Sequence, residues 1–499
     1  MLYVRMLITM GLSVYTSRAI LEILGITDFG IYNVVGGIVV VLGFLSGSLA
    51  GASTRFITYA LGEGDFDKEV STFRTLLVIH RWVAVALTLL VEIVGVWFLF
   101  NKMNIPPDRM MAAFWVLQCS VLTSVVSILS VPYNSLIIAH ERMDAFAFIS
   151  VFEAVAKLAI VYALLLFGDA DRLIIYAILI CVVQITVRII YSIFCNRTIP
   201  SSRGKGKFDK GLTREIASFV GWKINGDLAF VGCGQGINIV LNMFFGPVVN
   251  AARGISVQIQ NITTTFIQNY QLAVQPQIVK SYASGDISYL QYLIVICSKY
   301  GFFLMLLVAY PILMFTDQIL SLWLVDVPAD TSLLVKIILL VCFATPLRAP
   351  MIQTINATGK IKRFQIIEGT TLLMAVPVIY LELKFFNMSL RDVMLTYLFI
   401  EYLAQATRIW IVLPYVNMPF RAYSRDVLFP IFKVLVPMAI GYFLVTRYLV
   451  FEGWSVIWGA ILAEIICISS CLLLGLKKTE RSKFVDIIRK KVFSKCKTA

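Results

Sequence analysis

Long apolar blocks separated by short polar breaks run along the whole chain. Each block reaches the roughly 20 residues that a helix needs to cross a bilayer, and the blocks lack the short alternating segments of a membrane β-barrel. The pattern therefore predicts an all-α integral membrane protein with about fourteen transmembrane helices. The predicted spans are 2–22, 31–59, 76–100, 111–137, 146–167, 173–195, 215–244, 254–279, 290–316, 332–356, 364–386, 393–415, 428–448 and 454–476.

One of these spans lies within 253–286 and is unusually rich in Gln, Asn and Thr. Steps of three or four residues, or their sum, separate its polar positions, which places them in one stripe on a helix. The stripe comprises Gln258, Asn261, Thr265, Gln268 and Gln275. In such an apolar chain, we expect this stripe to face water or a polar passenger.

Composition supports a membrane protein, since 59% of the 499 residues are hydrophobic and only 14% are charged. The net charge of +14 would suggest a nucleic-acid partner in a soluble protein. Here Lys and Arg concentrate in the loops of one side and in the tail, which is the positive bias of cytoplasmic loops. We therefore expect contact with membrane lipids, no nucleic acid, and both termini in the cytoplasm. The first span has no signal-peptide features and is expected to be retained.

The chain is predicted to consist of two six-helix lobes and a two-helix addition. The segments are an N-terminal lobe, a basic cytoplasmic linker, a C-terminal lobe, two extra spans and a basic cytoplasmic tail, at 1–195, 196–214, 215–415, 416–476 and 477–499. Pro, Gly, Ser and Lys in the linker are typical of a flexible connector.

Weak internal symmetry relates the two lobes. Gly25 and Gly64 have the same separation in sequence as Gly246 and Gly285, and the second glycine of each pair lies in LGEGD or YASGD. A similar offset aligns Pro132, Ala139, Arg142 and Phe146 with Pro350, Ala357, Lys360 and Phe364. Such repeats of six helices in one orientation are typical of transporters with two rocking lobes.

Ionisable side chains within membrane spans are costly and are therefore candidates for function. Arg18 and Arg55, on the first two spans, could hold an anionic head group, because a guanidinium group forms bidentate hydrogen bonds with phosphate oxygens. Alternatively, these arginines reach the lipid headgroups from a helix end. Lys223 and Asp227, four residues apart on the seventh span, could contact the substrate or a coupling ion, or could neutralise each other as an ion pair.

The sequence carries no motif for catalysis, nucleotide binding or metal binding. Its two His and nine Cys have no ligand spacing, so we expect no metal and no cofactor. Gly43, Gly47 and Gly51 recur every four residues, which predicts a small-residue seam for close helix packing. We expect a protein that is not an enzyme and draws its energy from a gradient, the membrane potential or consumption of the product.

The opening stretch Leu24–Asn33 (LGITDFGIYN), then Gly36-Gly37 and Ser53-Thr54-Arg55-Phe56, resembles that of bacterial polysaccharide-biosynthesis flippases of the Wzx type. These flippases belong to the multidrug/oligosaccharidyl-lipid/polysaccharide exporter (MOP) superfamily, and the plan of six, six and two spans is similar over the whole chain. The resemblance implies translocation of an undecaprenyl-pyrophosphate-linked oligosaccharide across the bacterial inner membrane by alternating access. It places the protein in O-antigen, capsule or exopolysaccharide assembly, as a monomeric transporter beside polysaccharide polymerase machinery.

In that setting the amides of Gln258, Asn261, Gln268 and Gln275 would bind sugar hydroxyls, while Arg18, Arg55 and Lys223 would suit the pyrophosphate. One alternative is a cation-coupled multidrug exporter of the same superfamily, which would capture organic cations with membrane carboxylates. Another is a membrane glycosyltransferase or ligase acting on the same lipid. The latter would need a large outer loop, and the longest one predicted, 317–331, is short.

Overall fold

The computed structural model describes residues 43–101, 105–167, 171–204, 206, 208–324, 327–448, 455–477 and 480–481, with separate positions between 5 and 35. Arg18, Gly36 and Gly37 lie outside these described residues. The described residues are helical almost throughout and include no strand. Ten helices among them are long and apolar enough to cross a membrane. The all-α membrane fold class is therefore confirmed.

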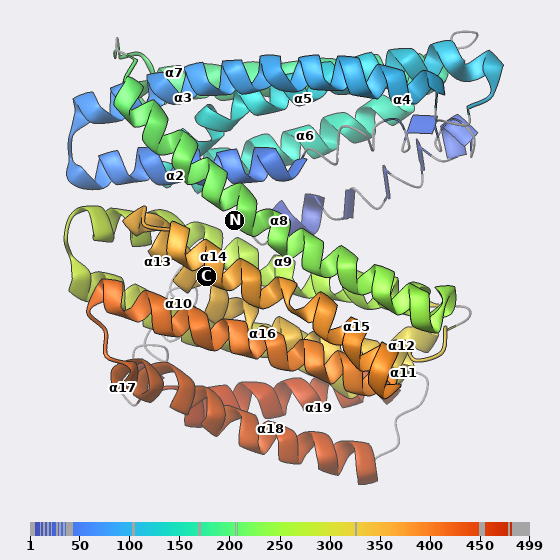
Figure 1. The fold of residues 1–499 in the computed structure, drawn as a ribbon, viewed down its shortest axis with the longest axis vertical. Helices are drawn as coiled ribbons and strands as arrows, with labels where there is room; N and C mark the ends of the chain where they lie inside the picture. Colours follow the sequence, from blue (N-terminus) through green and yellow to red (C-terminus); the bar gives the residue numbers. More distant parts are fainter. Residues whose placement is uncertain are drawn as a thin grey trace, which may run out of the picture. The chain divides into compact units, whose positions relative to one another are not determined.

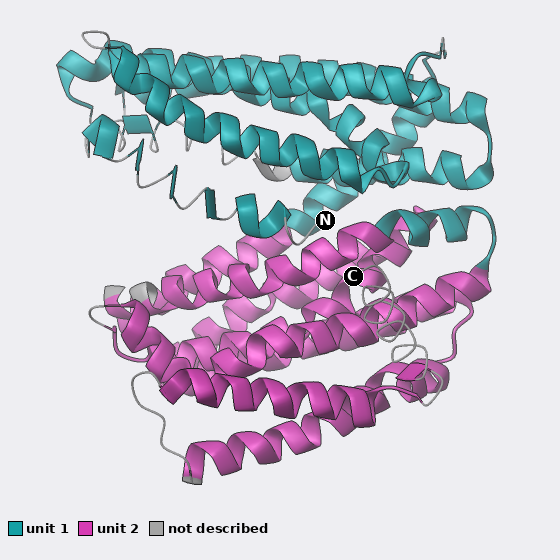
Figure 2. Cartoon of the chain, turned by 180° about the vertical axis from the view of Figure 1, so that it is seen from behind, with its two compact units in different colours: residues 1–227, 275–286 teal, residues 228–274, 287–499 magenta. Residues whose placement is uncertain are grey.

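The chain forms two compact units (Figure 2). Unit 1 comprises residues 1–227 and 275–286, and unit 2 comprises residues 228–274 and 287–499. Two long helices, α8 (Lys210–Phe245) and α9 (Pro247–Ala283), each contribute residues to both units. The lobe boundaries given above stay a prediction.

The helices of unit 1, besides parts of α8 and α9, are α2 (Gly43–Glu63), α3 (Phe66–Leu90), α4 (Val96–Asn101), α5 (Met110–Ala139), α6 (Met143–Ala163) and α7 (Arg172–Thr198). Helix α5 lies beside α2, α3 and α7 (Figure 1). Apolar side chains of α3, α5 and α7, among them Leu87, Leu117 and Leu173, are buried together in one core. Helix α7 begins at a carboxylate cap, because Asp171 accepts hydrogen bonds from the amides of its first turn.

In unit 2, α10 contacts α13, α18 and α19, and α16 contacts α12, α13, α14 and α15. The helices of this unit, besides parts of α8 and α9, are α10 (Ile287–Met314), α11 (Thr316–Trp323), α12 (Thr331–Cys342), α13 (Thr345–Thr358), α14 (Lys362–Leu373), α15 (Ala375–Phe386), α16 (Leu390–Val412), α17 (Phe420–Tyr423), α18 (Phe429–Tyr448) and α19 (Ser455–Ser470).

Two predicted spans, 332–356 and 364–386, are each interrupted in the structure. The first divides into α12 and α13, and the second into α14 and α15. Pro346 and Pro377 explain both interruptions, because proline cannot donate the hydrogen bond to the carbonyl four residues earlier. Those carbonyls belong to the last residues of α12 and α14.

Polar contacts group the loops of unit 1 at the two ends of its helices. Arg109 donates hydrogen bonds to Asp28 (2.5 and 2.9 Å) and to Asp171 (2.7 and 3.1 Å). These residues belong to loops predicted on the outer side. Glu69 pairs with His140 at 2.8 Å and accepts a hydrogen bond from Ser201, which joins loops predicted on the inner side. The grouping agrees with the predicted alternation of loops; the direction relative to the cytoplasm stays a prediction.

Backbone conformation supports the internal repeat. Gly25, Gly64, Gly246 and Gly285 all have φ between 72° and 78°, a left-handed conformation that glycine adopts without steric cost. They are the glycines whose equal spacing suggested the repeat. The second set of aligned positions behaves likewise, since Glu141 (φ 58°) follows α5 and Gly359 (φ 73°) follows α13. The two halves of the sequence thus share turn geometry as well as spacing.

Candidate functional site

One face of α8 carries polar and aromatic residues toward α2 within unit 1. Four-residue steps place these residues above one another on the helix. They are Glu215, Phe219, Lys223 and Asp227, and their partners on α2 are Ser48, Gly51, Arg55 and Phe56. We call these eight residues the α2–α8 ladder.

Asp227 makes polar contacts with side chains of both helices of the α2–α8 ladder. Its carboxylate accepts a hydrogen bond from Ser48 and lies 3.3 and 3.4 Å from the Lys223 ammonium. The Lys223 side chain is only 17% exposed and that of Asp227 is 36% exposed. Lys223 and Asp227 are therefore an ion pair, which was one of the two interpretations of their spacing.

Lys223 also lies over the backbone of α2. A Cβ atom added to Gly51 would approach Lys223 Cε to 2.8 Å, which is closer than packed atoms allow. A Cβ added to Gly47 would meet nothing within 4 Å. Of these two glycines, only Gly51 has a neighbour that an added Cβ would displace, and this neighbour is the flexible end of a charged side chain.

Arg55 is enclosed, with 5% of its surface exposed. Its guanidinium carbon lies 4.3 Å from the ring centre of Phe56, 5.0 Å from that of Phe219 and 5.5 Å from that of Tyr59. Glu215 is 3.8 Å away and offers a partly solvated counter-charge. Aromatic faces attract cations, so this cage fixes Arg55 between the helices. The ladder contains two cations, Arg55 and Lys223, and two carboxylates, Glu215 and Asp227, so its formal charges cancel.

The polar stripe lies on α9 as predicted by its periodicity. Gln258, Asn261 and Gln268, in unit 2, are exposed, while Gln275, in unit 1, is half-buried. Helix α9 is not among the ten helices that qualify as spans by apolar composition in the described part of the chain.

Arg253 anchors the beginning of α9 inside unit 2. The side chain is buried, donates a hydrogen bond to Asn238, and places its guanidinium carbon 5.9 Å from the ring centre of Tyr397. Such an anchor holds the rotation of the helix, and hence the direction of its amide stripe, within this unit.

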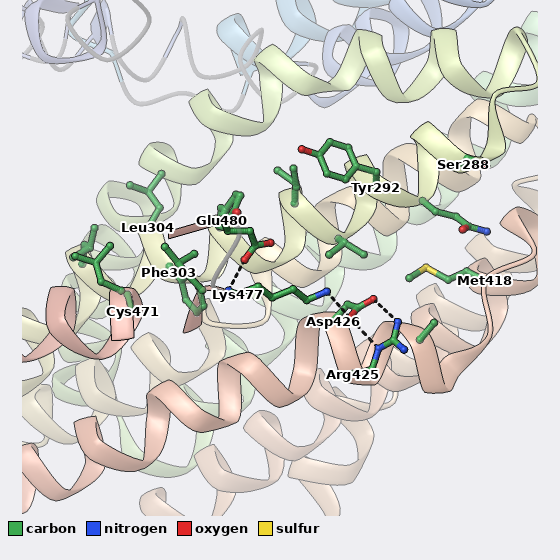
Figure 3. Close-up of a pocket in the computed structure, with 18 residues that line it drawn as sticks. Ser288, Tyr292, Phe303, Leu304, Met418, Arg425, Asp426, Cys471, Lys477 and Glu480 are labelled. Carbon is green, nitrogen blue, oxygen red and sulfur yellow. Dashed lines mark hydrogen bonds and ion pairs between the residues drawn. The ribbon is translucent and has the colours of Figure 1, made fainter. Parts of the chain in front are cut away.

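A concave region of about 930 Å³ lies in unit 2 between α10 and the segments 418–426 and 471–477, with Glu480 also in its lining (Figure 3). Apolar side chains such as Phe303 and Leu304 form much of its wall. Its charges are paired: Arg425 and Lys477 lie 3.1 and 3.0 Å from Asp426, and Glu480 binds the buried Lys299 at 2.6 Å. This groove therefore offers an apolar surface with a nearly neutral rim.

The predicted site residues fall into separate places. Arg55, Lys223 and Asp227 come together in the ladder, the amides lie along α9, and Arg18 lies outside the described residues. Ser48, Glu215 and Phe219 were not predicted. Continuing the four-residue step from Lys223 back along α8 would have found Glu215 and Phe219, whereas Ser48 had no sequence signal.

Comparison with known protein families finds no match, and comparison with curated protein sequences finds none either. Solved structures do match. An outward-facing multidrug resistance MATE family transporter of the MOP superfamily has a TM-score of 0.72 and 12% identity, over 83% of this chain and 94% of that one. A MOP superfamily transporter from Pyrococcus furiosus has a TM-score of 0.66 and 14% identity, over 83% and 94%.

A Vibrio cholerae MATE transporter gives a TM-score of 0.67 and 14% identity, over 84% of this chain and 93% of that one. Sequence identities this low establish the fold alone. The chain therefore has the fold of MATE transporters of the MOP superfamily, as the resemblance to a superfamily member implied. The Wzx-type subfamily is a finer statement that these similarities leave open.

Proposed function

We propose that this protein is a transporter that works by alternating access and carries an undecaprenyl-pyrophosphate-linked oligosaccharide across the bacterial inner membrane. The fold supports the first part, because the similar structures are those of transporters and are covered almost completely. The chemistry of α9 supports the passenger. The proposal includes cytoplasmic termini and a monomeric protein that works beside polysaccharide polymerase machinery.

The observation that carries the proposal is the exposed amide stripe of α9. This helix of 37 residues contains no Asp or Glu, and it exposes Gln258, Asn261 and Gln268. An amide both donates and accepts hydrogen bonds and carries no charge, which suits sugar hydroxyls. An organic cation would gain little from this surface, because a binding surface favours a passenger of opposite charge.

The ladder is consistent with the same passenger. Its carboxylates, Glu215 and Asp227, each face a cation, so neither is an uncompensated anion for capturing an organic cation. Lys223 and Arg18 remain our choice for contact with the pyrophosphate. Because Arg55 is caged by aromatic rings, we assign it a positioning role on α2, and we expect Lys223 to make the more direct contact.

A cation-coupled multidrug exporter is the second candidate, and the comparisons favour it, since the first similar structure cited is described as a multidrug resistance transporter. The Pyrococcus furiosus structure is described as having a binding pocket of reverse polarity that suggests a different function. Pocket polarity is thus the property that should separate passengers within this fold. On α9 this chain presents uncharged amides and no carboxylate.

The test replaces the stripe amides together, as Gln258→Leu, Asn261→Leu and Gln268→Leu. We expect surface polysaccharide to fall and the lipid-linked repeat unit to accumulate inside, at unchanged protein level. Thr265→Val is the matched control, because the Thr265 hydroxyl already donates to the Asn261 carbonyl at 2.6 Å. Normal polysaccharide in the triple variant, or strong efflux of organic cations by the wild-type protein, would overturn the proposal in favour of the exporter.

A further inference from the structure

The connection between α7 and α8 lies against the first turns of α3, within unit 1. Ser201 and Ser202 are buried, with 1% and 4% of their surfaces exposed. Ser201 donates a hydrogen bond to Glu69 of α3, and Arg74 of α3 donates one to the Gly204 carbonyl at 2.9 Å. We call the described residues of this connection, 199–204, 206, 208 and 209, the linker strap.

Two glycines of the linker strap make its close contact with α3 possible. A Cβ atom added to Gly204 would approach Val70 Cγ2 to 2.6 Å, and one added to Gly206 would lie 2.9 Å from the backbone carbon and oxygen of Val70. Packed atoms do not approach so closely, and the backbone of a helix cannot easily move aside. Glycine at these two positions therefore lets the linker strap cross α3 directly, where a larger residue would lift it away.

The last residue of the linker strap joins α3 to the beginning of α8. The Asp209 amide donates a hydrogen bond at 3.2 Å to the hydroxyl of Thr75, which is fully buried on α3. The Asp209 carboxylate accepts hydrogen bonds from the amides of Gly211 and Leu212 at 2.7 and 3.1 Å, which caps α8. Asp209 thus connects Thr75 to the first turn of α8 through its own backbone and side chain.

This connection bears on the α2–α8 ladder. Helix α8 is continuous from Lys210 through the positions of Glu215, Lys223 and Asp227, so a displacement of its first turn moves these side chains with it. Helix α3 and the part of α8 up to Asp227 belong to the same compact unit. The contacts of the linker strap therefore help to determine where Lys223 lies along α2.

We propose that the linker strap positions α8 for transport. It stays on α3 throughout the transport cycle, and Thr75 is a positioning residue that holds the first turn of α8, and with it Lys223, in place. This inference rests on the alternating-access transport proposed above, but not on the identity of the passenger. Locking the linker strap onto α3 should then be harmless to transport, whereas releasing it should impair transport.

A disulfide between the linker strap and α3 tests whether the strap stays in place. A Cβ added to Gly204 would lie 3.1 Å from Val70 Cβ, a few tenths of an ångström short of the separation of about 3.5–4.5 Å in disulfides. Val70→Cys combined with Gly204→Cys should therefore oxidise in membranes. We expect the oxidised protein to support as much surface polysaccharide as the same protein after reduction. A loss on oxidation that reduction restores would overturn the proposal, and so would failure of the disulfide to form.

Thr75→Val tests the positioning role, because valine keeps the size of threonine but lacks the hydroxyl. Asp209 is exposed, so its amide can bind water instead, and we expect the unfolding midpoint to change little. Transport should fall about tenfold, as for the loss of one or two hydrogen bonds that hold a productive position. Thr75→Ser retains the hydroxyl and should restore transport. Normal transport by Thr75→Val, or no recovery in Thr75→Ser, would overturn the role of this hydroxyl.

Gly206→Ala releases the linker strap by a second route, since the added Cβ would collide with the backbone of Val70. Gly221→Ala is the matched control, because a Cβ added there meets nothing within 4 Å. We expect Gly206→Ala to lower both transport and the yield of the Val70→Cys, Gly204→Cys disulfide, and Gly221→Ala to lower neither. Equal results for the two variants would contradict the proposal.

Failure of the proposed passenger would be recognised separately. If deletion of the gene left surface polysaccharide normal, the passenger proposed above would be wrong, while the yield of the disulfide would still report on the linker strap. Efflux of organic cations by the same variants would then replace surface polysaccharide as the measure of transport. Equal efflux by Thr75→Val, Gly206→Ala and the wild-type protein would overturn the positioning role in that case too.

Discussion

A side chain at Gly51 would collide with Lys223, since an added Cβ would lie 2.8 Å from Lys223 Cε. The sequence pattern of Gly43, Gly47 and Gly51 suggested close helix packing. At Gly51 the structure shows a different use of a missing side chain. The absent Cβ lets a lysine of α8 lie across α2 and reach Asp227, so a glycine on one helix permits an ion pair on another.

Gly51→Ala should therefore reduce transport without lowering the thermal stability of the protein. Alanine favours a helix over glycine by about 0.5–1 kcal/mol, and the Lys223 side chain is flexible enough to move away. We expect unchanged or slightly higher thermal stability but reduced transport. Gly47→Ala is the control, because it gains the same helix propensity and meets no neighbour within 4 Å. Equal transport by the two variants would contradict a role for the position of Lys223.

A double-mutant cycle on Lys223 and Asp227 should distinguish substrate contact from simple neutralisation. Pairs of this spacing contribute only about 0.3–0.5 kcal/mol, so we expect small and nearly additive changes in stability. Transport should be lost in Lys223→Met and Asp227→Asn, and also in the double variant, if Lys223 contacts the pyrophosphate. Recovery of transport in the double variant would show that the pair only cancels its own charges.

Because Arg109 donates hydrogen bonds to the Asp171 carboxylate, we expect the free energy of unfolding to depend on pH. Burial acts to raise the pKa of Asp171, but hydrogen bonds from Arg109 and from the backbone of α7 outweigh it and lower this pKa. Because the folded pKa lies below the unfolded value of about 3.9, the stabilisation is present above that pH and is lost as pH falls through the folded pKa.

Asp171→Asn tests the contribution of the Arg109–Asp171 ion pair, since asparagine can still cap α7 but carries no negative charge for Arg109. We expect a lower unfolding midpoint than wild type at pH 7, by the equivalent of about 1–3 kcal/mol. Below about pH 4 the difference should shrink, because the unfolded wild type takes up a proton first and the folded wild type loses its charge as pH falls through its lowered pKa. A difference that is constant with pH would argue that the carboxylate contributes through packing alone.

The pairing of Lys299 with Glu480 should show strong asymmetry between single and double substitutions. The Lys299 side chain is 1% exposed and that of Glu480 is 26% exposed. Glu480→Gln leaves a buried ammonium without its counter-charge, which should lower the free energy of unfolding by about 3–5 kcal/mol. Lys299→Met combined with Glu480→Gln should recover most of this loss. Thermal unfolding of the purified variants measures both, and additive losses would contradict the pairing.

The fold class and the order of the helices could be predicted from the sequence, because a bilayer imposes its thickness on each apolar block independently of the others. The ion pair of Lys223 with Asp227 was also foreseeable, since residues four apart on a helix are neighbours. Likewise, the equal spacing of Gly25 and Gly64 with Gly246 and Gly285 reflects a local backbone conformation that glycine encodes by itself.

Only the tertiary structure decided which helices face each other, and several interactions depend on that choice. Arg55 was expected to meet a phosphate or the lipid headgroups, yet its surroundings include Phe219 and Glu215 of α8, far away in sequence. The same holds for Arg109, which connects its own loop to Asp28 and Asp171 of two other loops. Periodicity fixes the face of a helix that a residue occupies, but the partner on the facing helix follows from packing of the whole unit.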